Sequence, residues 1–119
     1  MGKDYVVTLN RITCTHKGER SGDDLYIKYI VDGGRQERFP PKGNGKGNMK
    51  RGDTWAMDFP LYFDQSVVIE LYDGDVGRDQ YLGSTTYRKD DPEKEVRHLG
   101  QRDGDYELFS QKEKLKQHA

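Results

Sequence analysis

The chain has 119 residues, of which 34% are charged and 32% hydrophobic, and its formal net charge is −1. This length predicts one domain with a normal core, and the eight tyrosines, four phenylalanines and one tryptophan argue against a disordered chain. The nearly neutral charge excludes a global attraction to nucleic acid or membranes, so any such binding must come from a local patch.

Cysteine content and the N-terminal residues bear on localisation. Cys14 is the only cysteine, which excludes an intrachain disulfide, favours a reducing compartment and leaves secretion open. The N-terminal residues lead into a strand-like run without an apolar signal region, and no apolar stretch approaches the ~20 residues of a membrane-spanning helix. We therefore expect a soluble protein that is cytoplasmic or peripherally attached to a membrane.

Short runs of alternating apolar residues, separated by turn residues, predict strands throughout the chain. In chain order they cover residues 5–12, 25–31, 36–39, 55–59, 67–71, 81–87 and 106–109. Asp32-Gly33-Gly34 offers the left-handed backbone that a tight hairpin needs. Residues 93–98 fit either a helical turn or an edge strand. The predicted fold class is all-β, an antiparallel sandwich of about eight strands.

Two segments lack this alternation. Residues 40–52 are rich in glycine and contain no apolar strand pattern, which predicts a mobile loop. The cations of this loop are Lys42, Lys46, Lys50 and Arg51. Residues 111–119 predict a polar C-terminal tail, at most a frayed helix. The single domain is therefore expected to span residues 1–110.

Three carboxylates, those of Asp73, Asp75 and Asp79, follow the most apolar strand in a loop that contains glycine. Like charges so close repel by roughly 4 kcal/mol per pair at 4 Å and an effective dielectric of about 20. A cation would offset this repulsion, and carboxylate oxygens on a flexible loop suit Ca2+, which takes about 6–8 oxygen ligands. The alternative is a solvated acidic turn, because Asp-Gly is also ordinary turn chemistry. The residues alone leave both interpretations open.

Four segments in the expected order resemble the C2 domain family, the β-sandwich module named after the second conserved region of protein kinase C. They read DLYIK at 24–28, GDTWAMDF at 52–59, VIELYDGD at 68–75 followed by Leu82-Gly83, and GDYEL at 104–108. The resemblance covers residues 5–109. It implies a sandwich with an acidic pocket made by two loops at one end, which binds Ca2+ and docks on anionic phospholipid.

The resemblance also implies which residues would hold the ion. Asp73 and Asp75 match the core ligands of the third loop, and Asp24 matches the first loop. Asp79 lies four residues before Gly83 rather than the usual three. The family's other first-loop aspartate falls at Gly18, so Glu19 or Asp23 would have to substitute for it. Fewer carboxylates imply weaker binding or one ion instead of two.

The basic residues form a second candidate site. Lys28, Arg35 and Arg38 accompany the loop cations, and near an anionic leaflet each cation contributes ~1 kcal/mol to binding. This set is interpreted either as a lipid or partner surface or as an ordinary solvated face. Nucleic acid is not an expected partner, because residues 40–52 hold no aromatic residue for base stacking.

Other functions find little support in the sequence. An EF-hand would need a glutamate at Ser84 and flanking helices. His16, His98 and His118 show no metal-binding spacing, and Cys14 with His16 lacks a third orienting group, so we do not expect an enzyme. The alternative to a calcium and phospholipid module is a protein-binding module with a structural or absent calcium site.

Overall fold

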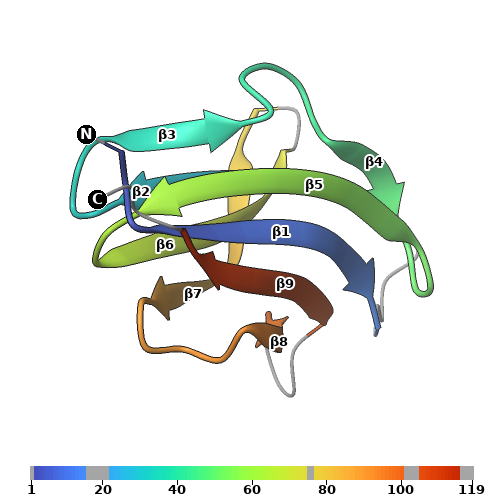
Figure 1. Cartoon of the computed structure of the whole chain (residues 1–119). Helices are drawn as coiled ribbons and strands as arrows, with labels where there is room; N and C mark the ends of the chain where they lie inside the picture. Colours follow the sequence, from blue (N-terminus) through green and yellow to red (C-terminus); the bar gives the residue numbers. More distant parts are fainter. Residues whose placement is uncertain (1, 16–21, 75–76, 101–104, 116–119) are drawn as a thin grey trace.

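The computed structural model describes residues 2–15, 22–74, 77–100 and 105–115. Within these ranges the chain forms nine β-strands (Figure 1). They are β1 (Tyr5–Cys14), β2 (Asp23–Val31), β3 (Gln36–Phe39), β4 (Lys46–Met49), β5 (Thr54–Phe63), β6 (Ser66–Gly74), β7 (Asp79–Arg88), β8 (Lys94–Leu99) and β9 (Tyr106–Lys114). A helix long and apolar enough to cross a bilayer is absent from the described residues.

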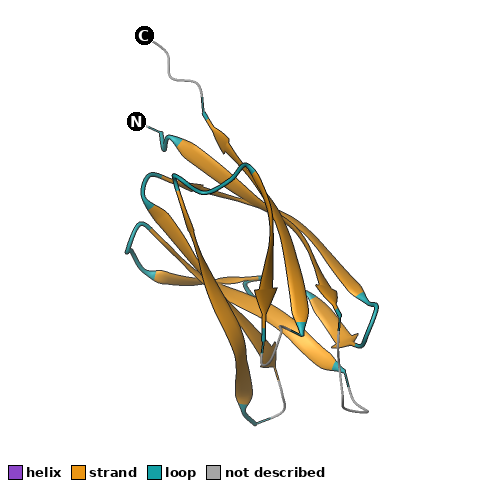
Figure 2. Cartoon of the chain, turned by 90° about the horizontal axis from the view of Figure 1, so that it is seen from below, coloured by secondary structure: helices purple, strands orange, loops and turns teal. Residues whose placement is uncertain are grey.

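The strands form two antiparallel sheets that pack face to face (Figure 2). One sheet has the order β5-β1-β9-β8, and the other has the order β3-β2-β6-β7, with β4 also paired to β2. The predicted all-β antiparallel sandwich is therefore confirmed. The described residues contain one strand more than the eight expected.

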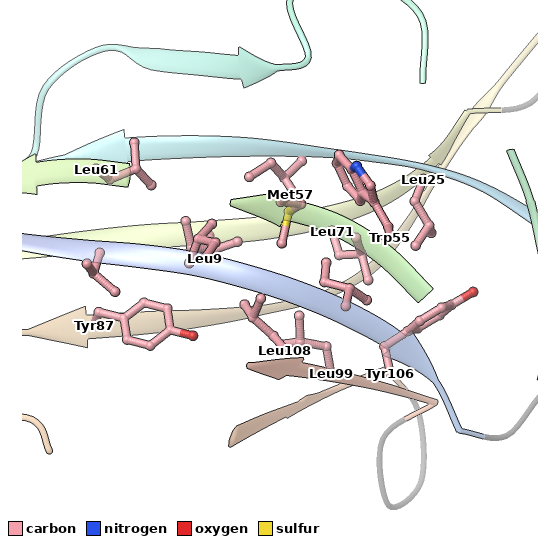
Figure 3. Close-up of a cluster of buried hydrophobic side chains, with 14 of the residues drawn as sticks. Leu9, Leu25, Trp55, Met57, Leu61, Leu71, Tyr87, Leu99, Tyr106 and Leu108 are labelled. Carbon is pink, nitrogen blue, oxygen red and sulfur yellow. The ribbon is translucent and has the colours of Figure 1, made fainter. Parts of the chain in front are cut away.

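Period-two alternation builds the core between the sheets. Along β6, Val67, Ile69 and Leu71 are fully buried and point inward, while the residues between them lie on the outer face. The inward side chains of both sheets meet in one hydrophobic cluster, with Leu9 and Leu108 from the first sheet and Leu25 and Leu71 from the second (Figure 3).

In place of the loop expected over residues 40–52, Lys46–Met49 form β4 and pair with β2. Met49 is fully buried, and the Gly45 amide donates to the Leu25 carbonyl at 2.8 Å. Gly45 also lies against the Trp55 indole, where a Cβ atom would come within 1.8 Å of the ring. Glycine therefore allows close packing at this position.

The segment that fitted two interpretations is an edge strand, β8, which pairs with β9. Arg97 of β8 points inward and connects it to the other sheet, donating to the Thr86 carbonyl at 2.6 Å. The same guanidinium pairs with Asp91 at 2.8 Å and Glu95 at 2.7 Å. At the C-terminal side, β9 continues to Lys114, so strand replaces the first part of the expected polar tail.

Candidate functional site

Two predicted metal ligands, Asp23 and Asp73, are buried carboxylates at one end of the sandwich, each only 5% exposed. Both occupy inward-facing strand positions: Asp23 lies two residues before Leu25 in β2, and Asp73 lies two residues after Leu71 in β6. The Tyr106 hydroxyl of β9 donates a hydrogen bond to Asp23 Oδ2. Burial raises the pKa of Tyr106, and the charges of Asp23 and Asp73 raise it further. Both carboxylates therefore raise the pKa of the same buried phenol.

Asp24 lies beside this pair but points to the outer face. Its amide donates to Asp73 Oδ1 at 2.7 Å, which ties β2 to the end of β6. Its own Oδ1 accepts from the Asn48 amide at 2.7 Å. Asn48 has a φ of 54°, a left-handed conformation that asparagine tolerates better than most residues. Asp24 thus holds β4 against β2.

Asp79 is the register partner of Gly74, the residue that follows Asp73, and lies on the outer face. It is exposed, and its Oδ2 accepts a hydrogen bond from the Tyr26 hydroxyl on the outer face of the second sheet. Burial and this hydrogen bond raise the pKa of Tyr26 to about 12. The Tyr26 ring stacks on Tyr72 with centroids 5.4 Å apart, and the Arg38 guanidinium lies 3.9 Å from its centre.

The structure therefore places Asp23 and Asp73 on the inner side of this pole, and Asp24 and Asp79 on its outer face. Asp75 and Glu19 lie outside the described residues. Within the described part of the chain, no group of three or more histidine, cysteine, aspartate or glutamate side chains is arranged to hold a metal ion. The oxygen donors of Asp23 and Asp73 suit Ca2+ chemically, but a complete ligand set would require Asp75.

The predicted basic residues divide into cations stacked on aromatic rings and cations in solvent. Lys28 and Arg38 are register partners on β2 and β3, and the Lys28 ammonium lies 4.6 Å from the centre of the Tyr72 ring. Arg35 is exposed, 3.8 Å from the Glu37 carboxylate. The charged side chains of the segment 40–52 extend into solvent; they are Lys42, Lys46, Lys50 and Arg51.

This basic segment reaches the acidic end of the sandwich. Met49 is the register partner of Asp23. A Cβ atom at Gly74 would lie 2.8 Å from Asn44 Oδ1, so the segment also passes close to the end of β6. Cations and carboxylates thus occupy neighbouring positions at one pole of the molecule.

Sequence reasoning missed the hydrogen-bonding partners of the aspartates. Tyr26 and Tyr106 were expected only as strand residues, and the asparagines of the basic segment received no role. Tyr26 follows Asp24 by two positions, which is a weak signal. Nothing in the sequence around Tyr106 indicates Asp23, which is 83 residues away.

No protein-family model matches this chain, and no curated protein matches it. Solved structures do. The chain is similar to a C2 domain structure at 16% identity and a TM-score of 0.60, covering 90% of this chain and 95% of that one. It is also similar to the C2 domain lettered A of plant extended synaptotagmin 1, at 14% identity and a TM-score of 0.59, covering 98% of this chain and 99% of that one.

A third similar structure is the pair of C2 domains, lettered A and B, of extended synaptotagmin 2, calcium bound. The identity is 16% and the TM-score 0.64, and the match covers 96% of this chain but 46% of that one. The chain thus spans nearly all of two similar structures and about half of a two-domain one. These similarities define the class: the chain has a C2-like fold. The proteins matched are similar in fold only.

Proposed function

We propose that this C2-like domain docks on anionic phospholipid membranes through its basic segment 40–52 and the Lys28–Arg38 face. The observation that carries the proposal is the fixed position of the segment. Gly45 is packed on Trp55 and Met49 is buried, so the cations between and beside them are held outward at one pole. The segment contains no carboxylate, so its charges add at a membrane surface.

The number of cations determines how strongly the basic segment would bind a membrane. Each Lys or Arg near an anionic leaflet contributes about 1 kcal/mol, and the four cations of the segment would act together. Lys28 and Arg38 are stacked on tyrosine rings, which holds their charges on the sheet face. Attraction of this kind is weakened by salt.

We further propose that Asp73 and Asp75, with Asp23 and Asp24, bind Ca2+ at the acidic pole. Bound Ca2+ would offset the carboxylate charge and offer open coordination to phosphate oxygens. The similarity in fold to a calcium-bound structure supports this assignment. Asp79 accepts a hydrogen bond from the Tyr26 hydroxyl, so it is a less suitable ligand than its spacing implied. A protein partner for the same pole is the competing proposal.

Co-sedimentation with phosphatidylserine vesicles tests the docking. The triple variant Lys42→Gln, Lys46→Gln, Lys50→Gln should pellet much less than the native chain. A charge-matched control is Arg88→Gln, Lys89→Gln, Lys114→Gln, because these side chains are also exposed but lie outside the basic segment. We expect the control to pellet like the native chain and both to dissociate at high salt.

Calcium and chelator arms separate the two parts of the proposal. Pelleting that needs calcium and disappears in Asp73→Asn/Asp75→Asn supports the metal assignment. Pelleting that ignores calcium but depends on the lysines supports docking by the basic segment alone. Equal pelleting of the two triple variants would contradict the proposed membrane surface.

A further inference from the structure

The outer face of the sheet β5-β1-β9-β8 carries a hollow that the proposed membrane docking does not use. It has a volume of about 370 Å³ and lies over β9 between β1 and β8. Its chemically distinctive lining residues are Asn10, Arg11, Lys94, Val96, Phe109 and Gln111. We propose that this hollow binds an acidic peptide segment, with a carboxylate held by Arg11 and Lys94 and a neighbouring apolar side chain on Phe109 and Val96.

A β-bulge explains why the hollow forms there. The pairing of β1 with both neighbours shifts between Leu9 and Arg11, which inserts Asn10 and re-aims the residues that follow. Arg11 then faces Phe109, with its guanidinium 3.9 Å from the ring centre. Phe109 in turn is the register partner of Val96. A cation, an aromatic ring and an aliphatic side chain therefore form one row across the face.

Apolar side chains are conspicuous on this outer face. Val96 is 44% exposed, and Phe109 is half-buried beside it. In a sandwich the outward positions of a strand are usually polar, because only the inner face is covered by the other sheet. An aromatic residue next to an arginine is also the composition that dominates binding at protein interfaces.

The cations of the hollow are not neutralised within the described residues. Arg11 and Lys94 form no ion pair there. Glu95 also lines the hollow, but its two oxygens accept from Arg97 at 2.9 and 2.7 Å. Outside the lining, the outward positions of β9 carry two further carboxylates: Glu107, which lies 3.8 Å from His98, and Glu113, which is exposed. The hollow thus presents two positive charges above a partly apolar floor.

This chemistry favours a peptide carboxylate over a lipid headgroup. Two cations match one carboxylate, and Arg binds carboxylates through paired hydrogen bonds. A polyphosphorylated headgroup would call for more cations and would gain nothing from Phe109 and Val96. The hollow is also in the middle of a sheet face and not at the loop-bearing pole where we place the membrane. Its size fits a small and transient interface.

NMR titration of the 15N-labelled full chain tests the proposal. The probe is the acetylated and amidated hexapeptide Glu-Phe-Glu-Leu-Glu-Val, and the comparison probes are the same peptide with lysine for glutamate, and inositol trisphosphate. We expect the acidic peptide to shift amides of β1, β8 and β9 around the hollow. Arg11→Gln/Lys94→Gln should weaken binding at least tenfold, and Lys94→Gln alone should weaken it without disturbing the stack on Phe109.

A matched control keeps this test independent of the membrane proposal. Lys42→Gln/Lys46→Gln removes two exposed cations from the pole proposed for membrane docking and should leave peptide affinity unchanged. Peptide shifts located elsewhere, equal affinity of Arg11→Gln/Lys94→Gln, or binding of inositol trisphosphate but not of the peptide would overturn the inference. Failure of vesicle binding would leave it standing, since the two surfaces share no residue.

Discussion

Both poles of this sandwich hold aspartates that are at least partly buried, and these aspartates have different surroundings. At one pole, Asp32 accepts hydrogen bonds from the backbone amides of residues 64, 65 and 66, at 2.9, 2.6 and 3.1 Å. The Lys3 ammonium adds a fourth donor at 2.8 Å. At the other pole, Asp23 and Asp73 lie together, and their donors include one phenol and one amide.

Asp32 is a structural carboxylate, and its surroundings differ from those of the candidate ligands Asp23 and Asp73. Asp32 has its charge compensated by N–H donors from a distant turn, which makes it a clamp between the β2–β3 and β5–β6 connections. Its φ of 51° is a conformation that aspartate tolerates. Asp23 and Asp73 place two carboxylates around one phenol, an arrangement that a bound cation would stabilise. The kind of donor, rather than burial, separates the two roles: the Lys3 ammonium lies 2.8 Å from Asp32 and 3.7 Å from Asp64, whereas Asp23 accepts from a phenol.

Removing the clamp should cause the largest loss of stability. We expect Asp32→Ala to lower the free energy of unfolding by about 3 kcal/mol, because several charge-assisted hydrogen bonds are lost and amides are left without their acceptor. Urea unfolding followed by tryptophan fluorescence measures this. Asp79→Ala is the matched control at the other pole, with an expected loss below about 1 kcal/mol because Asp79 is exposed. Equal losses would remove the distinction between the poles.

Removing the Tyr106 hydroxyl at the acidic pole should lower the free energy of unfolding. Tyr106→Phe deletes the donor to Asp23 and leaves a buried carboxylate less well solvated. We expect a loss of about 1–3 kcal/mol in chelator, measured by the same unfolding experiment. A stability equal to that of the native chain would show that the phenol does not hold Asp23.

The stability that Asp32 contributes should depend on acid pH, because it requires the ionised carboxylate. Burial alone would raise the pKa of Asp32, but the hydrogen bonds from Lys3 and the amides outweigh it and hold this pKa well below its ordinary value. The resulting stability is present above the unfolded pKa of about 4 and is lost as pH falls toward the folded pKa. Between pH 5 and 2 the native chain should therefore lose about 1–2 kcal/mol more than Asp32→Asn. Parallel pH profiles would contradict this account of the charge.

Much of the fold could be predicted from the sequence, because inward residues such as Ile69 and Leu71 alternate with outward ones. β4 could not, since its glycines and lysines are typical of a loop, and its pairing depends on contacts with β2 and Trp55. The edge strand at 94–99 could not be distinguished from a helical turn, because its charged residues fit both structures and the role of Arg97 depends on the other sheet.

The candidate site was predicted only in part. Asp73 continues the inward positions of β6, which its place after a buried strand allows, and its role as a metal ligand stays a prediction. Spacing could not place Asp79, whose orientation depends on Tyr26 in another strand. The role of Asp32 was equally hidden, since it has the pattern of a turn residue and its amide donors are more than 30 residues away.

A calcium site at the acidic pole is tested most directly by the melting temperature in millimolar Ca2+ compared with chelator, for the native chain, Asp32→Asn and Asp73→Asn/Asp75→Asn. Ligand at a hundredfold excess over Kd adds about 2.7 kcal/mol to the native state. We predict a calcium-dependent rise in the native chain and in Asp32→Asn, and none in the double variant. An unchanged native melting curve, or a rise that survives in the double variant, would contradict a calcium site at the acidic pole.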